Sequence, residues 1–161
     1  ALQSNENSAD LLARQFDLLR EELAGALLMR YVVLREMMAR TGGFPVDNRN
    51  ILYSGFGDDA AFNQKVRRYA GDPNAIAYTK EHATLLGLAP KPVVILSNLN
   101  DPTVPASISA RYAALTTVTG NADNVYTLPS IGKGHCAFTP EDIDKAFGVL
   151  TAWVSSGKRP H

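Results

Sequence analysis

The chain has 161 residues, of which 45% are hydrophobic and 20% charged, a length that suits one globular domain or part-domain and excludes two large cores. Sixteen basic and sixteen acidic residues cancel, which argues against nucleic acid as a partner because phosphate backbones require a surplus of positive charge. No apolar run approaches the roughly 20 residues that span a bilayer, so we expect no membrane span. The single cysteine, Cys136, excludes a disulfide within the chain and a cysteine-rich metal site.

The first 45 residues carry a helical pattern. Between residues 8 and 40, apolar side chains recur at three- and four-residue steps, which is the repeat of one buried helical face: Leu12, Phe16, Leu19, Leu23, Leu27, Tyr31, Leu34 and Met38. This pattern predicts one long helix, or two helices with the break at Gly25. Gly42 and Pro45 end it, because glycine tolerates positive φ and proline cannot continue a helix. We expect residues 1–45 to form a helical segment, either part of the core or a lid-like insert.

Residues 46–161 alternate between helical and strand patterns. Predicted helices begin at Asp58-Asp59, at Asp72-Pro73, after Pro105 and at Thr139-Pro140, and they run to about residue 69, residue 86, Gly120 and beyond Val154. The last of these helices is expected to bury Phe147, Leu150, Trp153 and Val154. Strands are expected at 93–97 and 125–128, with a loop at 129–138. This order predicts an α/β fold with a doubly wound parallel sheet.

Two residues with catalytic potential follow the two predicted strands. Asp101 lies at the end of the first apolar run, and His135 lies past the second, 34 residues later. The carboxyl ends of parallel strands meet at one edge of the sheet, so these side chains are expected to meet there. A carboxylate can orient a histidine ring and stabilise its charged form, which are the roles of two members of a serine-hydrolase triad. The plain alternative is that Asp101 only closes an Asp-Pro turn.

The motifs around these two residues resemble those of the α/β-hydrolase family. The segment from Asn100 to Pro105 looks like the family's acid loop, and Gly134-His135 looks like its histidine loop. Further matches to large bacterial members with a helical insert before the acid strand are Tyr53-Ser54-Gly55, Asp58-Asp59, Asn63, 66–69, 134–138, Trp153-Val154 and 157–160. The resemblance implies the carboxyl-terminal part of a hydrolase core in residues 46–161, action on a small-molecule ester, no metal or organic cofactor, and a secreted or periplasmic location.

The nucleophile of such a triad has no counterpart in the sequence. A nucleophile elbow needs small residues on both sides of its serine, whereas Ser54 has glycine only after it and Ser130 stands between Pro129 and Ile131. The sequence starts at Ala1 without an initiator methionine or a signal-peptide pattern, which is typical of a fragment made by cleavage. We therefore expect a second polypeptide, or an upstream piece, to supply the serine and the oxyanion hole.

Three hypotheses about function are compatible with the sequence. The first is a serine-type carboxylic ester hydrolase, incomplete without its partner, in which Asp101 and His135 are catalytic. The second is a peptidase or thioesterase that uses the same triad. The third is a non-catalytic doubly wound α/β interaction module, in which both loops are structural. Cys136 is expected to be a buried structural thiol, or to form a disulfide to the missing half.

Overall fold

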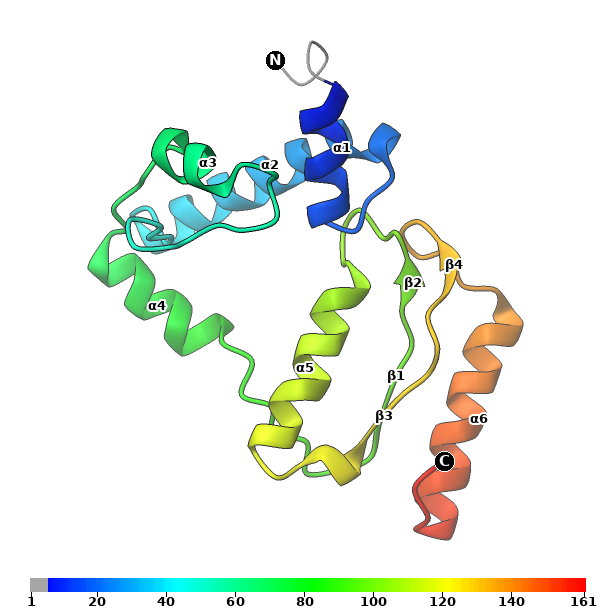
Figure 1. The fold of residues 1–161 in the computed structure, drawn as a ribbon. Helices are drawn as coiled ribbons and strands as arrows, with labels where there is room; N and C mark the ends of the chain where they lie inside the picture. Colours follow the sequence, from blue (N-terminus) through cyan, green and yellow to red (C-terminus); the bar gives the residue numbers. More distant parts are fainter. Residues whose placement is uncertain (1–5) are drawn as a thin grey trace. The chain divides into compact units, whose positions relative to one another are not determined.

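The structure is a computed structural model, and it describes residues 6–161. The chain divides into two compact units, Ala1–Thr84 and Leu85–His161 (Figure 1). These units reflect packing, so the expected division into a lid-like segment of residues 1–45 and a hydrolase part of residues 46–161 stays a prediction.

The first unit begins with two helices rather than one. α1 (Glu6–Gln15) ends in a turn, and a short 3-10 helix η2 (Arg20–Glu22) leads directly into α2 (Leu23–Thr41). The predicted break at Gly25 is wrong, because Gly25 lies within α2 and the chain turns at Asp17, whose φ is 55°. A single glycine inside a helix costs only about 1 kcal/mol relative to alanine, so it does not force a break. Gly42 ends α2 in the left-handed conformation, as predicted.

The core of the two helices is smaller than the apolar repeat indicates. Buried residues cluster where α1 faces the start of α2: Ala9, Leu18, Leu23 and Ala26, with Leu12 and Leu27 packed against them. Tyr31, which belongs to the same predicted stripe, is 55% exposed. The turn between the helices interrupts the regular rotation of about 100° per residue. The apolar stripe of α1 therefore does not continue onto one face of α2.

Two further helices of this unit begin at the residues that the sequence indicates. The side chain of Asp58 accepts a hydrogen bond from Ala61 N at the start of α3 (Asp59–Lys65). The side chain of Asp72 accepts bonds from Asn74 N and Ala75 N at the start of α4 (Pro73–Ala83). Both helices end earlier than predicted, because Val66 and Thr84 adopt extended backbone. N-terminal caps are local side-chain interactions, whereas these helices end without a glycine stop.

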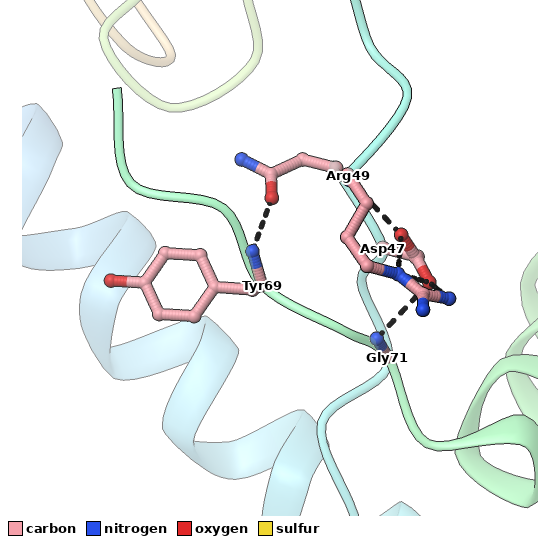
Figure 2. A network of polar contacts seen from close by, with 5 residues as sticks. Asp47, Arg49, Tyr69 and Gly71 are labelled. Carbon is pink, nitrogen blue, oxygen red and sulfur yellow. Dashed lines mark hydrogen bonds and ion pairs between the residues drawn. The ribbon is translucent and has the colours of Figure 1, made fainter. Parts of the chain in front are cut away.

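The segments before α3 and before α4 have no strands, and side chains hold them together. Asn48 accepts a bond from Tyr69 N at 2.6 Å, and Asp47 accepts one from Gly71 N at 3.3 Å (Figure 2). The Arg49 guanidinium donates to both carboxylate oxygens of Asp47 and holds the pKa of Asp47 well below its usual range. The bonds from Tyr69 N and Gly71 N join residues 21 and 24 positions apart, and the backbone bonds from Asn48 N to Tyr69 O and from Asp72 N to Phe44 O join the same two segments.

The second unit is built on two parallel strand pairs. β1 (Val93–Ile95) pairs with β3 (Val125–Thr127), and β2 (Asn98–Leu99) pairs with β4 (Ile131–Lys133). Backbone bonds between the pairs, such as Leu128 N to Ile95 O and Ile131 N to Ser97 O, make them one continuous two-armed ribbon. We call residues 93–101 the acid arm and residues 125–135 the histidine arm. Strand β4 lies in the segment expected to be a loop, so that expectation is wrong; three residues with two glycines nearby give no strand pattern.

Helices lie on both sides of the ribbon. α5 (Ala106–Val118) packs against β3 and α6 (Pro140–Ser156) packs against β1, on opposite sides of the strands (Figure 1). α6 begins with a capping box in which the Thr139 hydroxyl accepts from Asp142 N and the Asp142 carboxylate accepts from Thr139 N. The protein is thus a mixed helix and strand structure with small parallel sheets, which is compatible with an α/β fold. No described helix has the length and apolar character needed to traverse a bilayer.

The burial predicted for α6 is only partly correct. Trp153 is 5% exposed, whereas Phe147 and Val154 are 65% and 62% exposed. Successive helical residues are rotated by about 100°, so Phe147 and Val154 share one direction, and Trp153 points about 120° away from it. Only the side of α6 that carries Trp153 is buried in this unit.

Candidate functional site

The pairing of β2 with β4 places Asp101 and His135 at equivalent positions. Leu99 is paired with Lys133 in the last register of the ribbon. Asp101 follows Leu99 by two residues, and His135 follows Lys133 by two residues. A further bond from Gly134 N to Leu99 O keeps the two arms together up to the candidate site. The parallel register therefore brings the two side chains to the same end of the ribbon.

The two predicted residues contact each other. His135 Nδ1 lies 3.1 Å from Asp101 Oδ1 and 3.1 Å from Asp101 Oδ2. The Asp101 side chain is 8% exposed, and the His135 side chain is 47% exposed. Among the residues that the structure describes, His135 Nε2 has no hydrogen-bond partner. One ring nitrogen is thus held by a buried carboxylate, while the other is free to exchange a proton with a bound group.

The Asp101 carboxylate also organises its own loop. Its Oδ1 accepts hydrogen bonds from Thr103 N and Val104 N, each at 2.8 Å. Burial of the carboxyl group raises its pKa, but the bonds from Val104 N and Thr103 N, followed by the bond and charge of His135, outweigh burial and lower the pKa of Asp101 below its usual value. Asp101 therefore remains ionised at neutral pH and can stabilise a charged imidazole.

The backbone takes an unusual conformation beside each of these two residues. Asn100, next to Asp101, has φ of 48°, and Cys136, next to His135, has φ of 54°. Asparagine tolerates the left-handed region, but cysteine has no such preference. Together they are two of the three non-glycine residues with positive φ in the described part of the chain. Such conformations tend to gather at functional sites, where the surrounding structure holds them.

A pocket of about 190 Å³ opens beside the pair. Asp101 and His135 line it, together with residues of the acid arm, of the segments that follow the two arms, and of α5: Leu96, Ser97, Asn98, Val104, Cys136, Phe138 and Ser109. No sequence signal predicts Ser109 at this pocket, because the position of Ser109 depends on how α5 packs against the strands. Ser109 lies inside a regular helix, so it does not have the strand-to-turn backbone of a nucleophile elbow.

The other polar candidates have different surroundings. Ser130 Oγ lies 2.8 Å from Ser97 Oγ, which occupies it in a bond between the two arms. Ser54 belongs to the first unit and is exposed. Cys136 is a free, exposed thiol, so the expectation of a buried thiol is wrong. His82 is exposed and its ring contacts Tyr78 at a centroid distance of 4.3 Å.

Residues 6–161 contain no cluster of three or more His, Cys, Asp or Glu side chains with the geometry of a metal site.

Comparisons of the chain with protein-family models, with curated proteins and with solved structures found no match. Any function assigned to the site therefore rests on its geometry and on the motifs of the sequence.

Proposed function

We propose that this chain supplies the acid and the histidine of a Ser-His-Asp triad that hydrolyses carboxylic esters, with Asp101 as the acid and His135 as the base. The observation that carries the proposal is the bond between His135 Nδ1 and the buried carboxylate of Asp101, with Nε2 left free on an exposed ring. An acid bonded to one ring nitrogen fixes the tautomer in which the other nitrogen accepts a proton.

The proposed reaction has two steps. In the first, His135 Nε2 takes the proton of a serine hydroxyl as the serine oxygen attacks the ester carbonyl, and it returns that proton to the departing alcohol. In the second, Nε2 takes a proton from the water that attacks the acyl-serine, and it returns this proton to the serine oxygen as the acyl–oxygen bond breaks and the acid is released. Asp101 stays ionised through both steps and stabilises the charged ring, in keeping with its lowered pKa.

The serine belongs, in this proposal, to a second polypeptide or to another segment of the protein. No serine of the chain stands in a Gly-x-Ser-x-Gly sequence, and Ser130 is engaged with Ser97. The partner also supplies the oxyanion hole. Peptidase and thioesterase activities use the same acid and base, so the acyl and leaving-group pockets of the partner decide among them.

A non-catalytic role is the competing proposal, and one observation favours it. Asp101 Oδ1 closes a turn by accepting from Thr103 N and Val104 N, which is a complete structural role for an Asp-Pro segment. The His135 bond would then be a further structural contact of an interaction module. The two proposals differ in whether Nε2 serves a nucleophile.

The deciding experiment uses a serine-reactive fluorophosphonate on the protein isolated with whatever polypeptides accompany it. Denaturing electrophoresis and mass spectrometry then locate the label. The hydrolase proposal expects label on a serine outside this chain, at a rate that falls at least a hundredfold with His135→Ala and is unchanged with His82→Ala. Label on a serine of this chain, or no label in any preparation, contradicts the proposal.

A further inference from the structure

Asn98 is the buried polar residue whose amide has no partner. It begins β2, it is 1% exposed, and it is paired in the sheet with Ile131 of β4. Both Oδ1 and Nδ2 are fully buried and bond to no described residue. An asparagine amide has two N–H donors and one carbonyl acceptor, and nearly all such groups are satisfied when they are buried.

The amide oxygen of Asn98 and a carbonyl oxygen of residues 134–138, called the histidine loop below, both lie close to Gly132. A Cβ added at Gly132, whose φ is 64°, would lie 2.6 Å from Ala137 O and 3.0 Å from Asn98 Oδ1. The two oxygens therefore border the same small space, which is open only because residue 132 has no side chain. Both atoms are acceptors, so Asn98 Oδ1 gains no bond from the Ala137 carbonyl as oriented.

A half-turn of the Asn98 amide places a donor, instead of a second acceptor, toward the Ala137 carbonyl oxygen. The oxygen and the NH₂ group of an asparagine have nearly the same shape, so a half-turn about the Cβ–Cγ bond exchanges them without moving a neighbour. Nδ2 then takes the place of Oδ1, and a donor faces the Ala137 carbonyl. In this orientation a donor, rather than a second acceptor, lies toward the Ala137 carbonyl oxygen.

We infer that Asn98 is a positioning residue, which donates from Nδ2 to the carbonyl oxygen of Ala137 and thereby holds the histidine loop against the acid arm. The two arms are bonded up to Gly134, through Gly134 N and Leu99 O. Ala137 lies two residues beyond His135, so a bond there fixes the loop on the far side of the ring. The role of this bond in proton transfer rests on the proposed function. The existence of the bond does not depend on that function.

The first test detects the bond directly in the intact chain. With ¹⁵N in asparagine and ¹³C in the alanine carbonyl, a scalar coupling across the hydrogen bond is expected between Asn98 Nδ2 and the Ala137 carbonyl carbon. The same sample contains a matched control, because Asn124 Nδ2 donates to Ala89 O at 2.7 Å. Coupling at Asn124 without coupling at Asn98 overturns the inference.

The second test asks whether the bond positions His135. The Nδ1 proton of His135, held by Asp101, is expected as a resonance downfield of the backbone amides at low temperature. Asn98→Leu keeps a similar volume and removes the donor, so exchange of this proton with water is expected to speed up about fivefold, the factor associated with losing one hydrogen bond. Asn124→Leu is the control and leaves the rate unchanged.

An unchanged exchange rate in a folded Asn98→Leu variant shows that Asn98 does not position the ring. If that variant does not fold, the scalar coupling of the unsubstituted chain decides the matter alone. Both tests need no nucleophile and no turnover. They therefore succeed or fail independently of the fluorophosphonate experiment, which tests the proposed function.

Discussion

The hydroxyl of Ser97 lies 2.8 Å from the hydroxyl of Ser130, and this bond joins the acid arm to the histidine arm midway between the two strand pairs. Ser97 is 7% exposed, so removing either hydroxyl leaves its partner poorly hydrated. We expect Ser97→Ala and Ser130→Ala each to lower the free energy of unfolding by about 1 kcal/mol. Urea denaturation measures these changes.

The double variant tests whether the two hydroxyls act as a pair. If they do, the loss in the double variant is smaller than the sum of the two single losses, by about 0.5 kcal/mol or more. Ser107→Ala, at an exposed position of α5, is the control and is expected to change stability by less than about 0.5 kcal/mol. Strictly additive losses would show that the 2.8 Å contact contributes nothing to stability.

Replacement of His135 is expected to separate activity from folding. The ring is 47% exposed, and the Asp101 carboxylate that it contacts keeps its bonds from Thr103 N and Val104 N, so His135→Ala leaves the stability of the chain nearly unchanged. Esterase turnover by the complex with the nucleophile-bearing partner is expected to fall by about four orders of magnitude or more. Retained turnover in a folded His135→Ala complex would remove this residue from the mechanism.

Asp101→Asn tests the role of the acid in the same assay. The amide keeps the shape of the carboxylate but favours the wrong ring tautomer and loses the charge, so turnover is expected to fall by about 10⁴-fold, as for the corresponding change in serine proteases. Asp144→Asn, at an exposed position of α6, is the carboxylate control and leaves turnover unchanged. A loss of only a few-fold at Asp101 would point to another acid.

The lowered pKa of Asp101 predicts how stability depends on pH. The unfolded chain binds a proton at this carboxyl more readily than the folded chain does, so the favourable contribution is fully present above the unfolded pKa. It is lost as the pH falls through that value toward the lower folded pKa. Unfolding free energies measured across the acid range are expected to fall less steeply for Asp101→Asn than for the unsubstituted chain. Equal slopes would contradict this assignment.

Local signals in the sequence predicted more of the structure than long-range ones. Caps at Asp58, Asp72 and Thr139 are set by side chains that bond the next few amides, so each predicted helix start is confirmed. The break at Gly25 is wrong because the turn at Asp17 depends on packing between helices. Strand β4 was missed because three residues carry no period and exist as a strand only through pairing with β2.

The candidate site shows the same division. The contact between Asp101 and His135 was predictable, because chain order places both beyond the ends of strands that run parallel. Nothing in the sequence indicated that Asn98 would be buried without a partner, or that Gly132 would leave a space beside it. Those features depend on how the residues of the two arms align with each other, and the register of the short β2–β4 pair sets this alignment. The serine that the site would serve stays a prediction.

Two aromatic residues of α6 provide the last prediction. Trp153 is 5% exposed on the side of α6 that packs on the ribbon, whereas Phe147 is 65% exposed on a different side. Trp153→Ala is expected to lower the free energy of unfolding by about 3 to 5 kcal/mol, because it removes a large buried side chain and leaves a cavity. Phe147→Ala, the matched control on the same helix, is expected to change it by less than about 1 kcal/mol. Chemical denaturation of the two variants compares these values, and a similar loss at both positions would mean that Phe147 is buried in the protein in solution.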